Sequence, residues 1–132
     1  MSHLHRMSSR EIGQVRIYMT PRETRKGARM KGFFSKPLYQ EIIDAAKADG
    51  ILNAVAHPTH YGYSGNGQIH SDNMELPNTN LNLSVELIGS RDQLELFCRK
   101  HGELMTGKVV VYKHMEQWEM IPAMPSGVEH IG

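Results

Sequence analysis

Hydrophobic and polar residues alternate along two stretches of the chain, with the two-residue period of a half-buried β-strand. In residues 14–19 (QVRIYM) the apolar positions are Val15, Ile17 and Met19. Residues 80–88 (NLNLSVELI) repeat the pattern, with leucines and a valine at every second position. Each stretch therefore predicts a strand with one buried face.

Two further stretches are apolar without strict alternation. Residues 51–56 (ILNAVA) are apolar on both faces, as in a strand that is covered on both sides. Residues 109–112 (VVVY) are rich in β-branched side chains, which favour strands. They predict a second and a last strand.

Two segments combine helix-capping residues with apolar positions three or four residues apart. The first spans residues 35–50, with Ser35 as the N-cap and Gly50 as the stop. Ser90 and Gln93 form a capping box at the start of the second. The apolar stripes are Leu38, Ile42 and Ala45 in the first helix, and Leu94 and Phe97 in the second.

The predicted order is strand, helix, strand, strand, helix, strand. With right-handed crossovers, both helices lie on one face of a four-stranded antiparallel sheet, the ferredoxin-like βαββαβ arrangement of the α+β class. The other face stays uncovered, and open faces and edges of sheets favour association with another copy. The side chains expected on that face are Arg16, Tyr18, Asn82, Ser84, Glu86, and Val110 and Tyr112 or their neighbours. Arg16 and Glu86 are a candidate ion pair there, and a solvated pair of this kind contributes little stability.

Size and charge narrow the functional classes. The 132 residues predict one domain, and a formal net charge of +1 gives no overall field that would recruit nucleic acid or an acidic membrane. The single cysteine excludes an internal disulfide, and no apolar run of about 18 residues occurs, so we expect a cytoplasmic protein. We expect a domain over residues 14–118, between flexible tails at 1–13 and 119–132.

The connection between the second and third strands is a first candidate for function. From His60 to Thr79 it is about twenty residues long, well beyond the usual hairpin loop of about 2–5 residues. Its glycines permit unusual backbone angles, so we predict a loop that a ligand orders. A metal site built from His57, His60, His70 and Asp72 is the weaker interpretation. A His-x-x-His pair points to opposite faces of a strand, and no cysteine completes a tetrahedral set.

Residues 102–109 (GELMTGKV) are a second candidate, because they nearly match a phosphate-binding loop. Val109 stands where a serine or threonine would hold magnesium, and the segment leaves a helix and enters a strand, the reverse of a true phosphate loop. A hydrolytic site is therefore rejected. Two alternatives stay open: phosphate contacts from Thr106, Lys108 and exposed amides, or a helix C-cap followed by a turn.

Residues 21–34 are a third candidate, because they contain a cluster of basic side chains. Such a run is typical of a solvated loop, and otherwise of an anion or nucleic-acid contact. The predicted strands lack an aromatic platform like the one on which RNA-binding sheets stack bases, so we expect no nucleic-acid partner. The basic residues are Arg22, Arg25, Lys26, Arg29 and Lys31.

Together the segments VRIYM, KPLYQEIIDAAKADG, HYGYSGNGQIH, NLNLSVELI and TGKVVVY resemble the PII-like signalling superfamily over about residues 14–116. Within it the chain resembles a branch defined only as a domain of unknown function, and the carboxysome-associated PII-like protein. The resemblance implies a homotrimer with sheets facing inward and no catalysis. It implies an adenine nucleotide, AMP or ADP, as effector in clefts between subunits, with bicarbonate in members linked to inorganic-carbon uptake. It also implies a mobile T-loop that controls a membrane transporter or an enzyme, through which the protein could associate with a membrane or a carboxysome.

The resemblance also assigns residues, with no obligatory cofactor, catalytic residue or metal ligand. The implied nucleotide site comprises His60, Tyr61, Gly62 and Tyr63 at the T-loop base, Thr106, Gly107 and Lys108 in the B-loop, and Lys113, His114 and Trp118 from an adjacent subunit. The implied T-loop comprises Ser64, Gly65, Asn66, Gly67, Gln68 and His70. The B-loop lacks the Gly-Asp-Gly that precedes the lysine in well-known relatives, so their magnesium-triphosphate mode is not implied. The alternative is a metal-binding trimeric module of the copper-tolerance type.

Overall fold

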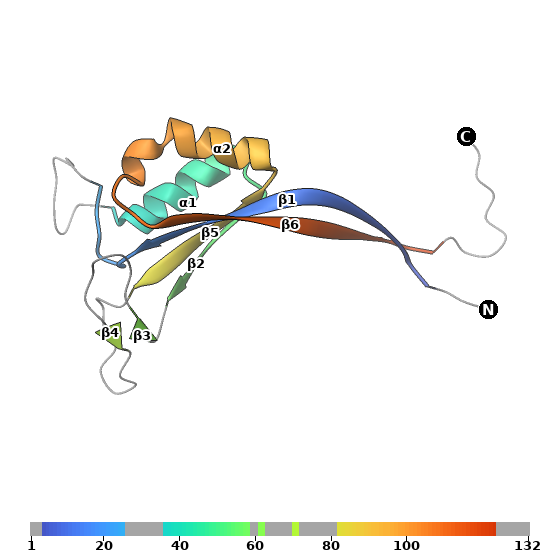
Figure 1. Ribbon diagram of the computed structural model, residues 1–132, viewed down its shortest axis with the longest axis horizontal. Helices are drawn as coiled ribbons and strands as arrows, with labels where there is room; N and C mark the ends of the chain where they lie inside the picture. The colour runs from blue at the N-terminus through green and yellow to red at the C-terminus, as the bar shows by residue number, and fades with distance from the viewer. Residues whose placement is uncertain (1–3, 26–35, 59–60, 63–69, 72–81, 124–132) are drawn as a thin grey trace.

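The computed structural model describes residues 4–25, 36–58, 61–62, 70–71 and 82–123 (Figure 1). The strands are β1 (Arg6–Met19), β2 (Asn53–Pro58), β3 (Tyr61–Gly62), β4 (His70–Ser71), β5 (Leu83–Gly89) and β6 (Val110–Ile121). The helices are α1 (Leu38–Ala48), α2 (Arg91–Lys100) and the short 3-10 helix η2 (Gly102–Leu104). None of the helices in the described segments is long and apolar enough to cross a membrane.

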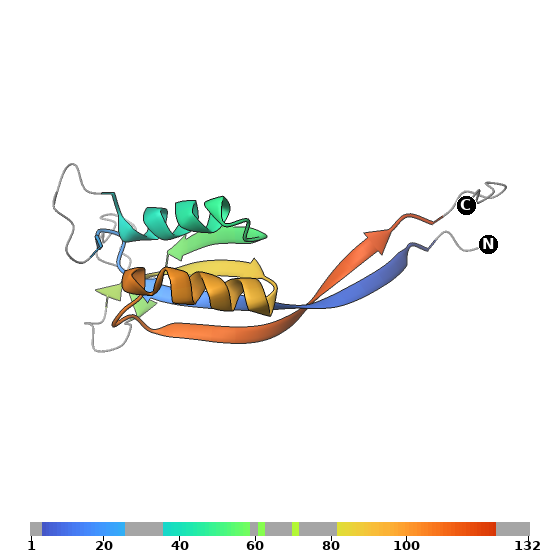
Figure 2. The ribbon, with the colours of Figure 1, turned by 90° about the horizontal axis from the view of Figure 1, so that it is seen from above.

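Four strands form one antiparallel sheet in the order β2-β5-β1-β6, and α1 and α2 cover the same face of it (Figures 1 and 2). This order and this one-sided covering are those of the ferredoxin-like fold, so the predicted fold class is confirmed. β3 and β4 form a separate two-stranded sheet within the long connection between β2 and β5.

The core lies between the helices and the sheet, and the alternating residues of β1 and β5 build its floor. Val15 pairs with Leu87 and Ile17 with Val85, so their side chains point to the same face, where all four are buried. The helices supply the opposite side of the core with Leu38, Ile42 and Ala46, and with Leu94 and Phe97. Ala46, one position beyond the predicted Ala45, completes the buried stripe of α1.

The start of α2 and the end of α1 each have a local cause. The amide N–H of Gln93 donates to Ser90 Oγ at 3.1 Å, which confirms Ser90 as the N-cap of α2. Gly50 has φ 78°, a left-handed conformation that ends α1. The predicted N-cap of the first helix is wrong: α1 begins at Leu38, and Pro37 rather than Ser35 is its N-cap residue.

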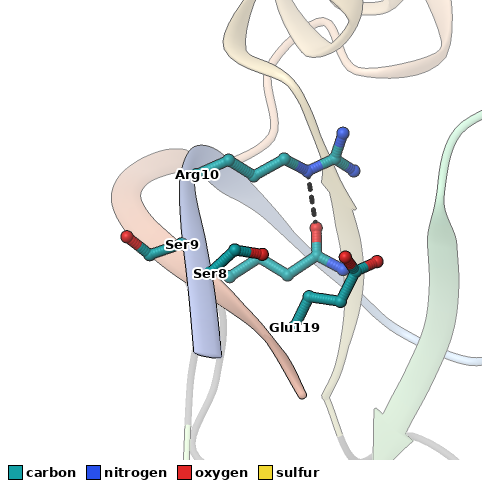
Figure 3. A pocket seen from close by; sticks show the side chains of 5 residues that line it. Ser8, Ser9, Arg10 and Glu119 are labelled. Atoms are coloured by element: carbon teal, nitrogen blue, oxygen red, sulfur yellow. Dashed lines mark hydrogen bonds between the residues drawn. The ribbon is translucent and has the colours of Figure 1, made fainter. Parts of the chain in front are cut away.

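The expected flexible tails are wrong for residues 6–13 and 119–121, which belong to strands. Residues 6–13 of β1 pair with residues 114–121 of β6, and this two-stranded ribbon extends beyond the helices (Figure 2). Its side chains show little hydrophobic period because the ribbon has no second layer to bury one face. Backbone pairing and cross-strand contacts hold it, such as the bond from Arg10 Nε to Gln117 Oε1 at 2.8 Å (Figure 3).

The face opposite the helices is uncovered, as predicted, and register decides which residues occupy it. Arg16 pairs with Glu86 on one side and with Val111 on the other, so these three share that face. Val111 and Lys113, rather than Val110 and Tyr112, are therefore the β6 residues there. The pairing of Tyr18 with Ser84 places those two residues on the face as predicted, and Asn82 is buried just before β5.

Candidate phosphate-binding site

The turn between α2 and β6 carries the predicted lysine. Leu104 and Met105 are buried and anchor the turn to the core, while Gly107 takes φ 79°, a left-handed angle that favours glycine. The N–H of Lys108 donates to the Met105 carbonyl at 3.0 Å and closes the turn. The structure thus contains the turn that one alternative predicted, with Lys108 at its exit.

A second segment, residues 20–25 after β1, lies beside this turn. The N–H of Tyr18 donates to the Val109 carbonyl at 3.1 Å, which holds the end of β1 against the start of β6. Beyond it, the N–H of Thr20 donates to Glu23 Oε2 at 3.1 Å, and the N–H of Leu38 donates to the Glu23 carbonyl at 2.6 Å. Glu23 therefore fixes the loop both to the end of β1 and to the start of α1.

The two segments enclose a cavity of about 370 Å³ at this corner. Three cationic and two anionic side chains line the cavity, so its formal charge is +1. Because the cavity is small, this charge is concentrated near any anion that enters it. The apolar part of the lining comes from Leu38 and Leu104. The charged residues are Arg22, Arg25 and Lys108, with Glu23 and Glu103.

Three polar side chains of the cavity, those of Lys108, Glu23 and Thr106, already have partners within the chain. The Lys108 ammonium forms an ion pair with the Glu23 carboxylate, and both side chains are more than two-thirds buried. Burial lowers the pKa of Lys108, because removal from water penalises the charged form. Thr106 Oγ1 donates to the Gly102 carbonyl at 3.0 Å. An anion would bind here by exchanging with these partners.

The second pair of the cavity is looser. Arg25 Nη1 lies 3.9 Å from Glu103 Oε1, at the limit of an ion pair, and the side chains are 46% and 76% exposed. An exposed pair at this distance contributes little, so Arg25 is the cation more available to an incoming anion.

From the sequence, Glu23 is not identified as a site residue, because residues 21–34 are interpreted there only by their basic side chains. The available signal was the spacing Thr20-x-x-Glu23, the capping-box pattern in which a glutamate bonds back to the N–H three residues earlier. The contact with Lys108 had no sequence signal, since it depends on the tertiary approach of two loops.

The predicted T-loop residues can be placed only in part. Tyr61 pairs with Ser71 and Gly62 with His70, so the base of the connection forms a short hairpin. That hairpin lies at the same end of the molecule as the α2–β6 turn (Figures 1 and 2). The other predicted T-loop and T-loop base residues, His60, Tyr63, Ser64, Gly65, Asn66, Gly67 and Gln68, lie outside the described residues. Their roles stay predictions.

The remaining predicted site residues lie elsewhere on β6. Lys113 lines a cavity of about 190 Å³ on the uncovered face. His114 and Trp118 belong to the ribbon, where Trp118 Nε1 donates to Glu116 Oε1 at 2.6 Å. A cavity of about 300 Å³ is also hollowed into the ribbon next to Arg10 and Glu119 (Figure 3). Within one chain, then, Lys113, His114 and Trp118 do not meet Lys108.

The histidine at the end of β2 has a carboxylate partner. His57 Nε2 lies 2.7 Å from Glu86 Oε2, and Glu86 also accepts from Gln14 Nε2 at 2.6 Å. Arg16 Nε lies 3.4 Å from the same carboxylate, which confirms the candidate pair. Within the described segments no group of three or more His, Cys, Asp or Glu residues could hold a metal ion. His60, Asp72 and the side chain of His70 lie outside that description.

The fold and this corner define the class of domain to which the chain belongs. It is a ferredoxin-like α+β domain with two helices on a four-stranded antiparallel sheet, a long connection after β2 and a lysine-bearing turn before β6. The chain belongs to the family DUF190, whose description is "Uncharacterized ACR, COG1993" and whose model matches residues 14–117. No curated protein sequence matches the chain significantly.

Solved structures of similar fold include CPII from Thiomonas intermedia K12, a nitrogen regulatory PII-like protein. Its complex with ADP and bicarbonate has a TM-score of 0.55 at 6% identity, covering 83% of this chain and 91% of that one. The apo form has a TM-score of 0.53 at 8% identity, and the match covers 86% of this chain and 99% of that one. A complex with ADP, AMP and bicarbonate has a TM-score of 0.55 at 7% identity, and the match covers 83% of this chain and 91% of that one. At such identities the similarity establishes the fold alone.

Proposed function

We propose that this chain is a non-catalytic PII-like signalling protein that binds an adenine nucleotide, AMP or ADP, and controls a partner through its T-loop. The observation that carries the proposal is the corner cavity, in which Lys108, Arg22 and Arg25 converge on a turn with a left-handed glycine. The CPII structures, described as bound to ADP, AMP and bicarbonate, support the choice of ligand.

The chemistry of the cavity suits a phosphate joined to an apolar ring. An ammonium and two guanidinium groups supply charge-assisted donors, and guanidinium can bind two phosphate oxygens at once. Leu38 and Leu104 offer apolar surface next to these donors. Pockets with a few convergent polar groups on an apolar lining are typical of small-molecule sites.

The length of β6 favours a nucleotide site that is shared between subunits. β6 rises about 3.3 Å per residue, so Trp118 lies about 26 Å from Val110 along the strand. A mononucleotide bound at Lys108 could not reach the Trp118 of the same chain over that distance. We therefore propose a homotrimer in which Lys113, His114 and Trp118 of one subunit approach the Lys108 corner of the next. Val55 and Val111 on the uncovered face, and Met7, Trp118 and Met120 on the ribbon, are exposed apolar side chains that such an assembly would cover.

The signal would be transmitted by selection between T-loop conformations. A nucleotide shifts a loop equilibrium only as far as it binds one loop state more tightly than the other. The β3–β4 hairpin lies at the same end of the molecule as the α2–β6 turn (Figure 1), which lines the cavity, so ligand contacts there could differ between the two states. The proposed reader is a membrane transporter or an enzyme, and bicarbonate is a proposed second ligand.

Calorimetric titration with AMP, ADP, ATP and cyclic AMP, with and without bicarbonate, tests the ligand. We expect saturable binding of AMP or ADP that Lys108→Ala weakens by about tenfold or more, because a charge-assisted bond is lost. Lys47→Ala, in the last turn of α1 at the far end from Leu38, is the matched control and should bind normally. The absence of heat for every adenine nucleotide would refute the proposal.

Subunit mixing tests the shared site. Sedimentation should give the mass of three chains, and Lys108→Ala and Trp118→Ala should each weaken nucleotide binding at every site by about tenfold or more. Random assembly of the two variants in equal amounts should restore about a quarter of the sites, since both intact residues then meet at some interfaces. A single-chain site would show no recovery on mixing.

A further inference from the structure

Glu23 is a carboxylate set inside a cavity whose other polar groups suit an anion. It pairs with Lys108, the central cation of the corner, and the side chains of both are mostly removed from water. A carboxylate oxygen and a phosphate oxygen are chemically similar acceptors for an ammonium group. Glu23 therefore binds Lys108 in the way that the nucleotide phosphate is proposed to bind it.

We propose that Glu23 is an internal competitor of the nucleotide phosphate and thereby sets the affinity of the site. The inference rests on the proposed function, because it concerns the same lysine. A phosphate that reaches Lys108 either displaces the Glu23 carboxylate or lies beside it. Displacement breaks an existing ion pair, and coexistence places two negative charges in one partly buried site. Both routes weaken nucleotide binding relative to a chain without the charge at position 23.

The backbone contacts of Glu23 make its position independent of Lys108. Its carbonyl accepts from the Leu38 N–H, and its second carboxylate oxygen accepts from the Thr20 N–H. The carboxylate is thus directed at the lysine by the fold of the loop, and a glutamine at this position keeps an acceptor for Thr20 while removing only the charge.

The cavity also contains its own control. Glu103 lines the same space and carries the same charge, but its only ion pair among the described residues is the long, exposed contact with Arg25. Glu23→Gln and Glu103→Gln change the net charge of the protein and of the cavity equally. Any difference between them therefore reports the direct contact with Lys108 rather than the overall field.

The test is calorimetric titration of ADP into the full-length chain and its variants. We expect Glu23→Gln to bind ADP about tenfold more tightly, the scale of one charge-assisted bond, and Glu103→Gln to change affinity less than about twofold. Adenosine, which has no phosphate, should bind Glu23→Gln and the wild type alike. In a Lys108→Ala background the gain from Glu23→Gln should disappear, because the competitor no longer has a target.

The outcomes separate the inference from the proposed function. Lys108-dependent binding of ADP to the wild type, with no tightening in Glu23→Gln, overturns the competitor and leaves the function intact. Failure of the wild type to bind any adenine nucleotide overturns both. Should Glu23→Gln melt well below the wild type, Glu23→Asp serves instead. It keeps the charge but withdraws it by one methylene from Lys108, and an affinity equal to or lower than wild type would then overturn the inference.

Discussion

Gly13 lies where the ribbon leaves the core, and the ring of Tyr112 lies against it. A Cβ added at Gly13 would come within 2.4 Å of Tyr112 Cε1 and 2.6 Å of the phenolic oxygen, so in Gly13→Ala the ring has to move. Tyr112 is 40% exposed and can turn outward into solvent. In doing so it would leave the Arg91 guanidinium, whose carbon lies 5.5 Å from the ring centroid.

The expected loss is the sum of three terms. A tyrosine buries about 200 Å² when covered, so the covered part of Tyr112 is worth at most about 3 kcal/mol, and about half of that if the ring finds partial cover elsewhere. The lost cation–π contact adds about 0.5–1 kcal/mol. Replacing a strand glycine by alanine returns about 0.5–1 kcal/mol of backbone entropy. Gly13→Ala should therefore lower the free energy of unfolding by about 1–2 kcal/mol.

The change in the free energy of unfolding is measured by urea unfolding at one fixed protein concentration, followed by circular dichroism. The substitution should also lower Tm by about 3–5 °C for each kcal/mol lost. The decisive comparison is the same substitution in Tyr112→Ala. With the ring removed only the entropy term remains, so Gly13→Ala should there stabilise the protein. Gly102→Ala is the control, since its Cβ would meet nothing within 4 Å. A destabilisation of equal size with and without the Tyr112 ring would refute the steric argument.

Three further outcomes are expected. Hydrogen bonds from His101 and Lys100 hold the pKa of Asp49 below its ordinary value. The stability that these bonds give is therefore present above the unfolded-state pKa of about 4, and it is lost as the pH falls towards the folded-state pKa. Unfolding measured as a function of pH should show the stabilities of the wild type and Asp49→Asn converging in acid. Gly107→Ala should lower the free energy of unfolding by about 1 kcal/mol and weaken ADP binding, because φ 79° is strained for alanine; equal thermal melts and titrations would contradict this. Trp118 is the only tryptophan, so if subunits cover the ribbon, acrylamide should quench its fluorescence less in the assembled protein than at dilutions that dissociate it.

The elements that sequence patterns predicted are those that bury a face. β1 and β5 alternate because Val15, Ile17, Leu87 and their neighbours point into the core, and α2 follows from its cap and its stripe. The ribbon was missed because, before Ile12, neither face of its first strand is buried within the chain. Serines, arginines and glutamates can form a paired strand without any hydrophobic period, and their pairing partners are specified across the sheet rather than along the sequence.

The candidate site divides in the same way. Lys108 and Thr106 could be predicted because a glycine and a lysine at a helix-to-strand turn are a local signal. The contact between Glu23 and Lys108 could not be predicted, because it depends on the hydrogen bond that joins Tyr18 to Val109 and so brings two distant loops together. Local chemistry thus indicated the cation of the site, and only the tertiary structure revealed the carboxylate beside it.

That carboxylate bears on how such a site could respond to changing nucleotide levels. A partly buried ammonium without an anion would lower the stability of the fold, because desolvation penalises an unpaired charge. With Glu23 and phosphate as alternative partners, Lys108 is paired in both states, and the free energy of binding is the difference between two ion pairs rather than the whole of one. Under the function and the competitor proposed above, such a difference would keep the nucleotide readily released. Arrival of the nucleotide would also be coupled to the release of Lys108 by Glu23, the residue that joins the end of β1 to the first residue of α1.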